Sequence, residues 1–250
     1  MSVFRAVLTD VSLLRDAVDT ISQLIGEGIF KADKDGISFN ATDRAIVAVV
    51  DFKLDKNVFE VYEVSGTIKM GLNVDSLLQI LKRAGAKDKL ELSLSDDESK
   101  LNVKMVGETT RKFSMPLLDI TEGEVPSPDN LDFSTKLQIR TPVIEEGVSD
   151  AAIVSDSLVF ESEDDALVMR TDGDSSSAEL RVDKNGGLLS LNGKPARSRY
   201  PLDYLKKMIR GARIADVASI SFGKDFPMRI EFINPEKASM RFLLAPRVED

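Results

Sequence analysis

The side chains that could support chemistry in this sequence are carboxylates, Lys, Tyr and Ser, because two common catalytic residue types are missing. The 250-residue chain contains no His and no Cys. A Ser-His-Asp triad, a Cys nucleophile and a thiolate or imidazole ligand for a transition metal are therefore excluded. Asp164, Asp165, Asp172 and Asp174 could together hold Mg²⁺ or Ca²⁺. Acid-rich loops between strands are more often solvated turns, so we expect no catalytic residue, no metal and no cofactor.

Composition narrows the remaining classes of protein. The formal net charge is −9 and 42% of the residues are hydrophobic, which is enough for a buried core. The acidic balance argues against indiscriminate nucleic-acid binding, so any contact with DNA needs a local basic face. There is no apolar run near 18 residues, no signal-peptide pattern and no phosphate-binding GxxxxGK[ST] loop. We expect an intracellular protein without a membrane span, and the lack of Cys suits a reducing cytoplasm.

An acidic connector separates two similar halves. Residues 117–132 hold five acidic residues and two Pro, and they show neither the helical nor the strand apolar period. When the sequence is aligned with itself at a shift of 130 positions, apolar residues between positions 14 and 52 fall on apolar residues of the second half without a gap. Phe30, for example, falls on Phe160. We predict domains at residues 1–116 and 134–250, joined by a connector at residues 117–133.

Each half is predicted to be mostly antiparallel sheet with two helices, which is an α+β fold. The apolar period predicts a helix from Thr9 to Gly26 or Gly28 and a second one from Asn73. In the second half, Thr141 is expected to cap the third helix, and Pro201 to begin the fourth. Strands are predicted at residues 3–8, 28–39 with a turn at 34–36, 45–54, 67–72, 90–94, 101–106, 109–115, 158–160, 166–170, 178–182, 188–191, 220–222, 228–233 and 238–244.

Three sequence blocks accompany this duplicated unit. They are residues 70–73 running into 80–85, residues 115–119, and residues 243–250 with the sequence LLAPRVED, which is the most specific. With the repeat, they make the chain resemble the sliding clamps of DNA replication, the proliferating cell nuclear antigen family in its archaeal and eukaryotic form. The similarity covers essentially the whole chain. It implies a ring-shaped trimer, with helices lining a central hole and sheets forming the outer wall.

The resemblance also implies a function and partners. It indicates a DNA polymerase processivity factor, a homotrimer that encircles double-stranded DNA without reading its sequence. Partners in replication and repair would be DNA polymerase, the clamp loader, flap endonuclease and DNA ligase, bound through short peptide motifs. The compartment would be the cytoplasm, beside the nucleoid, in an archaeon and the nucleus in a eukaryote. One subunit of a heterotrimeric clamp and a non-catalytic adaptor stay open as alternatives. The sequence does not separate a homotrimer from a heterotrimer, because both need the same two ring edges.

Basic residues on the helices are the candidates for the face toward DNA, although ordinary solvated faces are the alternative. The set is Arg15, Lys82, Arg83, Lys87, Lys206, Lys207, Arg210 and Arg213. The third helix departs from the family pattern with Glu145, Glu146 and Asp150. These carboxylates should repel phosphate, and some could instead favour the helix N-terminus.

A hydrophobic groove for partner peptides is implied beneath the connector. Its predicted residues are Ile46, Val47, Val49, Val125, Pro126, Pro227, Leu243, Leu244, Ala245 and Pro246. Core packing is the alternative for the strand residues, above all for Val49 and Leu244. Pro227 and Pro246 are better candidates, because Pro interrupts sheet pairing and exposes its ring.

Two unlike edge strands should close the ring, since head-to-tail contacts generate a cycle. The predicted interface residues are Thr109, Arg111, Lys112 and Phe113 on one edge and Ser177, Glu179, Arg181 and Asp183 on the other. Pairing these strands would bring basic residues of one subunit to acidic residues of the next. The ring should then loosen as salt rises. Two edge strands protected by their charges are the alternative.

Overall fold

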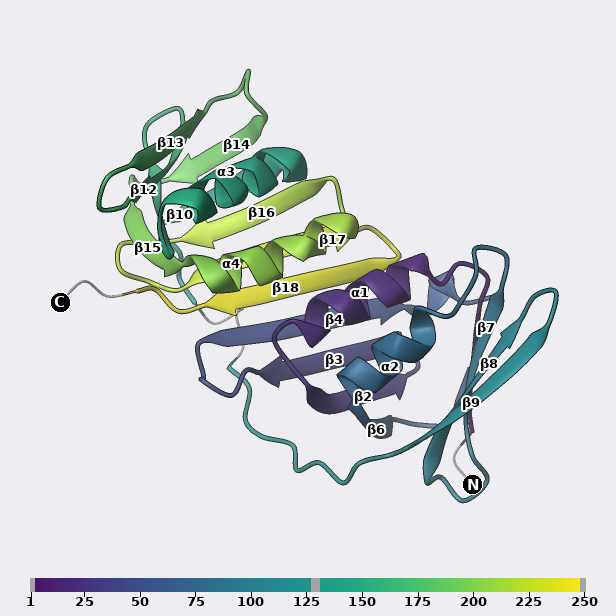
Figure 1. Ribbon diagram of the computed structural model, residues 1–250. Helices are drawn as coiled ribbons and strands as arrows, with labels where there is room; N and C mark the ends of the chain where they lie inside the picture. The colour runs from purple at the N-terminus through teal and green to yellow at the C-terminus, as the bar shows by residue number, and fades with distance from the viewer. Residues whose placement is uncertain (1–2, 127–130, 248–250) are drawn as a thin grey trace. The chain divides into compact units, whose positions relative to one another are not determined.

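The computed structural model describes residues 3–126 and 131–247. Its contacts divide the chain into two compact units (Figure 1). Among the described residues, the N-terminal unit comprises 3–42, 50–125 and 234–239, and the C-terminal unit comprises 43–49, 126, 131–233 and 240–247. Residues 127–130 of the predicted connector and residues 248–250 of the C-terminal block lie outside the described residues.

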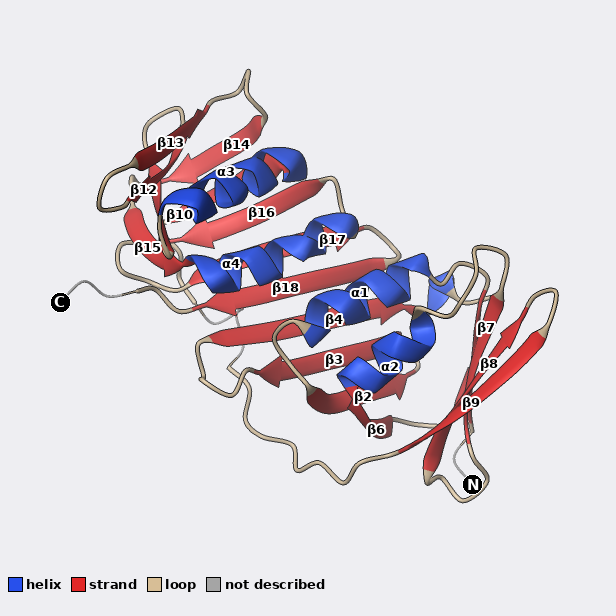
Figure 2. Ribbon diagram, in the orientation of Figure 1, coloured by secondary structure: helices blue, strands red, loops and turns tan. Residues whose placement is uncertain are grey.

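The N-terminal unit consists of antiparallel sheet and two α-helices. Five strands form one sheet in the order β5-β1-β7-β8-β9, and β3, β2 and β6 are neighbours in a second. Helices α1 and α2 lie side by side on one face of β2, β3 and β6 (Figure 2). The elements are β1 (Phe4–Leu8), α1 (Ser12–Ser22), β2 (Glu27–Asp33), β3 (Gly36–Thr42), β4 (Ala48–Asp55), a 3₁₀ helix η1 (Lys56–Val58), β5 (Val61–Val64), β6 (Ile68–Asn73), α2 (Val74–Leu81), β7 (Lys89–Leu94), β8 (Lys100–Val106) and β9 (Thr110–Pro116).

The predicted apolar stripes of the first two helices form part of the core. Leu14 and Val18 of α1 and Leu77 of α2 are each at most 4% exposed. Helix α1 ends at Ser22, earlier than the predicted end at Gly26 or Gly28. Ile25 is nevertheless 5% exposed, so the apolar period continues into the chain after the helix.

Two glycines of the N-terminal unit allow close approaches of the backbone. Gly36 ends the predicted turn between β2 and β3 with a φ of +141°, and a Cβ there would lie 2.1 Å from the carbonyl oxygen of Leu54. Gly71 on β6 faces the start of the connector, where a Cβ would lie 2.1 Å from the carbonyl oxygen of Leu118. A side chain at either position would push the neighbouring backbone away.

The C-terminal unit repeats the same plan. Four strands form a sheet in the order β13-β12-β11-β15, and β14, β10, β16 and β17 are consecutive neighbours in another. Helices α3 and α4 lie on one face of β10, β16 and β17 (Figure 1). The elements are β10 (Thr135–Arg140), α3 (Thr141–Val154), β11 (Ser157–Ser162), β12 (Leu167–Asp172), β13 (Ser177–Val182), β14 (Leu188–Gly193), β15 (Arg197–Pro201), α4 (Leu202–Met208), a 3₁₀ helix η3 (Ile209–Arg213), β16 (Val217–Phe222), β17 (Met228–Asn234) and β18 (Ala238–Leu244).

The α+β fold with antiparallel sheets is confirmed, and the described part of each half contains two α-helices. Some predicted boundaries were wrong. Arg140, not Thr141, occupies the cap position of α3, and Thr141 is a buried residue of the first turn. The fourth helix changes to 3₁₀ geometry at Ile209, where Gly211 lies so close to Phe232 that a Cβ would be 2.4 Å from its ring. The short strands β5, β10 and β15 were not predicted.

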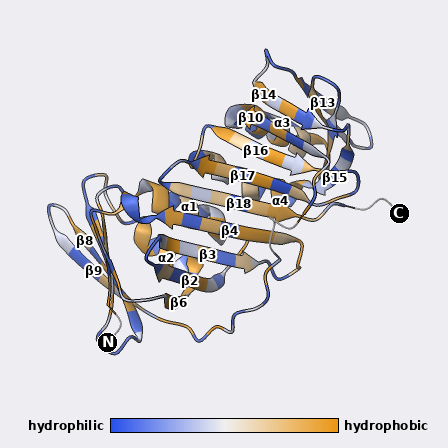
Figure 3. Cartoon of the chain, turned by 180° about the vertical axis from the view of Figure 1, so that it is seen from behind, coloured by the Kyte–Doolittle hydropathy of each residue, from blue (hydrophilic) through white to orange (hydrophobic). Residues whose placement is uncertain are grey.

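Strands of the C-terminal unit alternate between buried apolar residues and partly exposed charged ones. On β17, Met228 and Ile230 are at most 1% exposed, whereas Arg229 and Glu231, which alternate with them, are partly exposed. Figure 3 shows hydrophobic and hydrophilic residues along this strand. The period of two places one face toward the core and leaves the other face charged.

Candidate functional site

The basic residues of the N-terminal unit gather around the end of α2. Lys82 follows the last residue of α2, and Arg83 and Lys87 lie in the turn after it, where all three are exposed. The ammonium of Lys82 forms an ion pair with Asp19 of α1 at 3.2 Å. The guanidinium of Arg15 forms an ion pair with the carboxylate of Asp16 at 3.6 Å. Two of the four predicted cations of this unit are therefore partly neutralised within the chain.

The basic residues of the C-terminal unit lie on α4 and on η3 after it. Lys206 is exposed in the last turn of α4 and has no ion pair among the residues the structure describes. The ammonium of Lys207 lies 5.2 Å from the centre of the Tyr204 ring, a cation–π contact. Arg210 and Arg213 are on η3, not on the α-helix. Basic residues near a helix C-terminus also interact favourably with the helix dipole. Stabilisation of α4 therefore accounts for part of this pattern.

Helix α3 presents acidic residues in the described structure, as its sequence predicted. Glu145, Glu146 and Asp150 are all exposed. The helix begins at Thr141 and has no acidic residue in its first turn. The interpretation that these acids favour the helix N-terminus is therefore wrong, because the dipole acts mainly within that turn.

The predicted groove residues differ in exposure. Ile46 is 79% exposed, and Val47, Leu243, Ala245 and Pro246 are partly exposed. In the same segments, Val49 is 5% exposed and Leu244 is 0% exposed. Val49 and Leu244 therefore belong to the core of the C-terminal unit. Of the remaining predicted residues, Pro227 and Val125 are partly exposed and Pro126 is exposed.

The turn that carries Ile46 is built around the carboxylate of Asp43, which is 8% exposed. One oxygen accepts the backbone N–H groups of Val47 and Ala48, each at 2.8 Å. The other accepts the N–H of Ala45 at 3.2 Å and the hydroxyl of Tyr204 at 2.7 Å. Burial opposes ionisation of the carboxyl group, but these hydrogen bonds outweigh it and hold the pKa of Asp43 below its usual value.

The same turn is joined to the C-terminal segment. The backbone N–H of Ala245 donates to the carbonyl oxygen of Val47 at 2.9 Å. Ile46 has a φ of +58°, a left-handed conformation that β-branched residues rarely adopt. Such a conformation persists where surrounding contacts impose it, and strained residues of this kind gather at functional sites.

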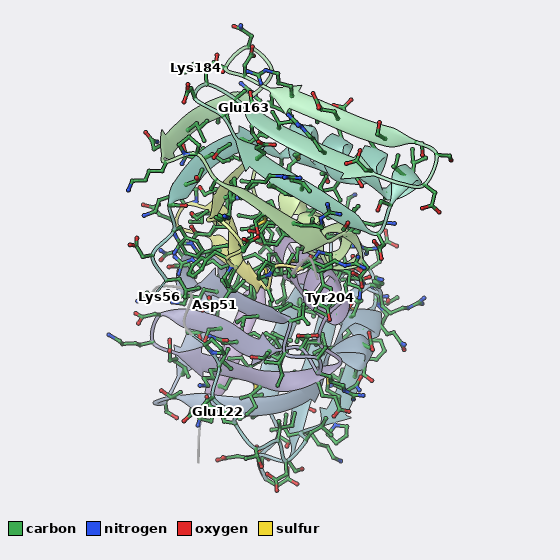
Figure 4. All side chains as sticks on the ribbon, turned by 90° about the vertical axis from the view of Figure 1, so that its left-hand side faces the viewer. Asp51, Lys56, Glu122, Glu163, Lys184 and Tyr204 are labelled. Carbon is green, nitrogen blue, oxygen red and sulfur yellow. The ribbon has the colours of Figure 1, made fainter. Side chains whose placement is uncertain are left out.

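The first part of the connector is attached to the N-terminal unit. The N–H of Leu117 donates to the carbonyl oxygen of Ser99 at 2.9 Å, and that of Leu118 donates to Gly71 at 2.8 Å. Glu122, labelled in Figure 4, accepts hydrogen bonds from the ammonium groups of Lys31 and Lys69, the latter at 2.7 Å. These two lysines lower the pKa of Glu122 to about 2, so the carboxylate stays ionised at neutral pH.

The two predicted ring edges are edge strands of separate sheets. β9 ends the five-stranded sheet of the N-terminal unit, and β13 ends the four-stranded sheet of the C-terminal unit. Phe113 on β9 and Leu180 on β13 are partly exposed on faces that they share with the buried residues Met115 and Val182. Of the other predicted interface residues, Thr109 lies just before β9, and Ser177 begins β13.

Most of the charges at these edges already have partners in their own chain. Arg111 donates to the carboxylate of Asp88 and, at 2.7 Å, to the carbonyl oxygen of Arg83. The guanidinium of Arg170 forms an ion pair with the carboxylate of Glu179 at 3.0 Å. Arg181 forms ion pairs with Glu163 and Asp165, and Asp183 accepts backbone N–H groups of its own turn. Lys112 is exposed and has no ion pair among the described residues. The predicted pairing of Arg111 with Glu179 or Asp183 would thus need these contacts to break.

Three further observations bear on the sequence predictions. Asp165 is bound to Arg181 at 3.1 Å, and no group of three potential metal ligands occurs within residues 3–126 and 131–247. A cavity of about 400 Å³ lies beside the C-terminal segment, with Arg197, Lys224 and Arg247 among its lining residues. None of the predicted groove residues lines it. Within the described part of the chain, no helix has the length and apolarity needed to cross a membrane.

Sequence reasoning missed two residues that organise the Ile46 turn. Asp43 was not predicted as the centre of this turn, although an Asp whose side chain accepts nearby backbone N–H groups is typical of such turns. Tyr204 gave no signal, because it is 161 residues from Asp43 in the sequence.

Comparisons with known proteins agree with this architecture. A sequence model of the family described as proliferating cell nuclear antigen, N-terminal domain, matches residues 3–123. The DNA polymerase sliding clamps of Pyrococcus horikoshii and Pyrococcus furiosus are 35% and 36% identical over 249 residues, which is 99% of this chain and of each relative.

Solved structures give the same result. The crystal structure of PCNA from Thermococcus kodakaraensis has a TM-score of 0.90 at 27% identity and covers 98% of this chain and 100% of that one. A chain of the PCNA2-PCNA3 complex from Sulfolobus tokodaii has the same TM-score at 26% identity, with the same coverage. The chain belongs to the proliferating cell nuclear antigen family of DNA polymerase sliding clamps.

Proposed function

We propose that this chain is a DNA polymerase processivity factor, a sliding clamp that encircles duplex DNA and tethers replication and repair proteins to it. The observation that carries this proposal is similarity along the entire chain to proteins named DNA polymerase sliding clamp. The role is non-catalytic: the clamp holds other proteins on DNA, and those proteins perform the reactions. Because these relatives are archaeal, we place its action at the nucleoid in the cytoplasm.

The clamp is held on DNA by enclosure. A trimer carries a formal net charge of −27, three times the −9 of one chain, and yet it surrounds a polyanion. Each phosphate contact contributes only about 0.9 to the slope of log affinity against log salt, so a few screened lysines hold weakly at moderate salt. Weak contacts suit a ring that must slide, because a strong contact would stop it at one position.

The residues closest to DNA in this proposal are the uncompensated cations. Lys206 and the turn residues Arg83 and Lys87 are exposed, and Lys206 has no ion pair among the described residues. Arg15, Lys82, Lys207, Arg210 and Arg213 add to the same positive field. The acidic face of α3 should stay farther from phosphate, or contact it through water and cations.

The ring closes when β9 of one subunit pairs with β13 of the next. Pairing would satisfy the free backbone groups of both edges and would bury the partly exposed faces that contain Phe113 and Leu180. Because this chain carries both edges, three copies suffice to close a ring, and a homotrimer is the assembly that we propose. A mixed ring is the second candidate, because the Sulfolobus tokodaii structure is described as a PCNA2-PCNA3 complex.

Partner proteins dock through short peptides whose apolar anchors contact the Ile46 turn and the C-terminal segment Ala245–Pro246. The side chain of Ile46 is 79% exposed, so it is accessible to such an anchor. Pro227 and the connector residue Pro126 complete the proposed groove. DNA polymerase, the clamp loader, flap endonuclease and DNA ligase are the expected partners.

Primer extension tests the proposed function directly. On a primed single-stranded circle with an archaeal replicative polymerase and its clamp loader, adding this protein should lengthen the product made in a single binding event of the polymerase. The expected increase is at least about tenfold, because a tethered polymerase rebinds at high effective concentration. The reaction without clamp loader is the control and should give short products. Products of equal length with and without this protein would contradict the proposal.

A further inference from the structure

The Ile46 turn holds an apolar side chain out of the protein in an unfavourable conformation. Ile46 combines a left-handed φ of +58° with 79% exposure. An isolated turn of this sequence would relax to another conformation, because a branched Cβ conflicts with the backbone there. The contacts around the turn must therefore impose this geometry.

Those contacts come from α4 and from the C-terminal segment. Within the turn, Asp43 accepts three backbone N–H groups at 2.8 to 3.2 Å. Tyr204 donates its hydroxyl to the same carboxylate at 2.7 Å, and this hydrogen bond fixes the turn to α4. From the C-terminal segment, the N–H of Ala245 donates a hydrogen bond to the carbonyl oxygen of Val47 at 2.9 Å.

The Tyr204 side chain is itself held in place. Its ring lies beneath the ammonium of Lys207, 5.2 Å from the ring centre, and the residue is partly exposed on α4 (labelled in Figure 4). Burial and the hydrogen bond to Asp43 raise the pKa of Tyr204 to about 12. The hydroxyl is therefore protonated at neutral pH and available as a donor.

We propose that Tyr204 is a positioning residue for partner docking: its hydroxyl, acting through Asp43, fixes the turn so that Ile46 is presented to an apolar anchor of a partner peptide. This inference rests on the proposed function of the groove. Without the hydroxyl, the turn spends part of its time in other conformations. Only molecules in the competent conformation bind the peptide, so the apparent affinity falls in proportion to the fraction of molecules that keep this conformation.

The test is Tyr204→Phe in the full-length trimer, since this change removes the hydroxyl and keeps the ring over which Lys207 lies. The probe is a synthetic peptide with one aliphatic and two aromatic anchors. Its binding to the trimer is measured by fluorescence anisotropy. We expect affinity to fall about fivefold, which corresponds to about 1 kcal/mol. The backbone N–H groups of Val47 and Ala48 should exchange with solvent faster, because their acceptor Asp43 is less firmly held.

Tyr62→Phe is the matched control. The Tyr62 hydroxyl also donates to the backbone, to the carbonyl oxygen of Gly36 at 2.6 Å, but it lies in the N-terminal unit. This variant should bind the peptide as the unmodified protein does. A general loss of stability on losing a tyrosine hydroxyl would instead affect both variants.

An Ile46→Ala background shows whether Tyr204 acts through Ile46. In this background, Tyr204→Phe should lower affinity by less than about twofold, because coupled residues give non-additive effects. Unchanged affinity and unchanged exchange in Tyr204→Phe would overturn the proposal, and so would an equal loss in both backgrounds. If the unmodified trimer fails to bind the peptide at all, it is the proposed groove that fails, a result distinct from the failure of Tyr204.

Discussion

Replacing Phe113 with Asp should convert the trimer into monomers. Phe113 is partly exposed on the edge strand β9, and in the proposed ring it becomes buried against β13 of the next subunit. A carboxylate left there without a partner costs about 3 kcal/mol or more, which weakens the contact by about 100-fold or more. Native mass spectrometry at micromolar concentration should detect monomers. The circular dichroism spectrum should stay close to that of the unmodified chain.

Ser114→Asp is the matched control for this change, since it introduces the same residue at the neighbouring position. Ser114 is exposed on the other face of β9 and is not among the predicted interface residues. We expect a trimer affinity within about threefold of the original, the range of a surface charge change. A stable trimer of Phe113→Asp would contradict the proposed closure through β9.

The sequence alone predicted that the ring loosens as salt rises, and the structure reduces the expected size of that effect. Arg111 is bound to Asp88, and Glu179 lies beside Arg170 in the same chain. Fewer charges remain to pair across the edge, so backbone hydrogen bonds and apolar contacts should dominate closure. We expect a shallow salt dependence of trimer dissociation.

Replacing Ile46 with Asp should lower the affinity of the trimer for an anchor peptide by about 30-fold or more. Central apolar anchors of an interface typically contribute about 2 kcal/mol or more each, and 1.4 kcal/mol corresponds to a factor of ten. Ile46 is suited to this role because it is 79% exposed and held by the Asp43 turn. Fluorescence anisotropy or calorimetry with the peptide measures the effect, and the trimer should stay intact.

Ile153→Asp makes the same chemical change at another exposed isoleucine. Ile153 is 85% exposed on α3 and is not among the proposed groove residues. This variant should bind the peptide as tightly as the unmodified trimer. Peptide affinity that is unchanged in Ile46→Asp would remove the turn from the groove. Polar replacement of Leu244 is unsuitable as a test, because that side chain is 0% exposed and its loss would damage the core.

Much of the fold could be predicted because its pattern is periodic. The apolar residues of α1 and α2 recur at helical spacing, and both helices were predicted with nearly correct starts. Long alternating strands such as β8 and β17 were also predicted. The strands β5 and β15, with four and five residues, are too short for a clear period. Helix α4 changes to 3₁₀ geometry at Ile209, and the close approach of Gly211 in that segment to the ring of Phe232 has no signal in the local sequence.

The candidate sites could be predicted in part only. Residue type and resemblance pointed to Ile46, to Pro246 and to the two edge strands. Burial separated Val49 and Leu244 from these residues, and it depends on how strands pack in three dimensions. The contacts of Arg111 with Asp88 and of Tyr204 with Asp43 join residues 23 and 161 positions apart, so no local pattern could reveal them.

Retention of the loaded clamp on closed and on linear DNA tests the central claim, which is that enclosure holds the protein on DNA. The labelled protein is loaded onto a nicked circular plasmid by an archaeal clamp loader and ATP, and free protein is removed. Half of the sample is then cut once with a restriction enzyme at moderate salt. We expect the protein to remain on the circle for at least about ten times longer than on the cut DNA, where it slides off the ends. Equal retention on the circle and on the linear DNA would contradict the account.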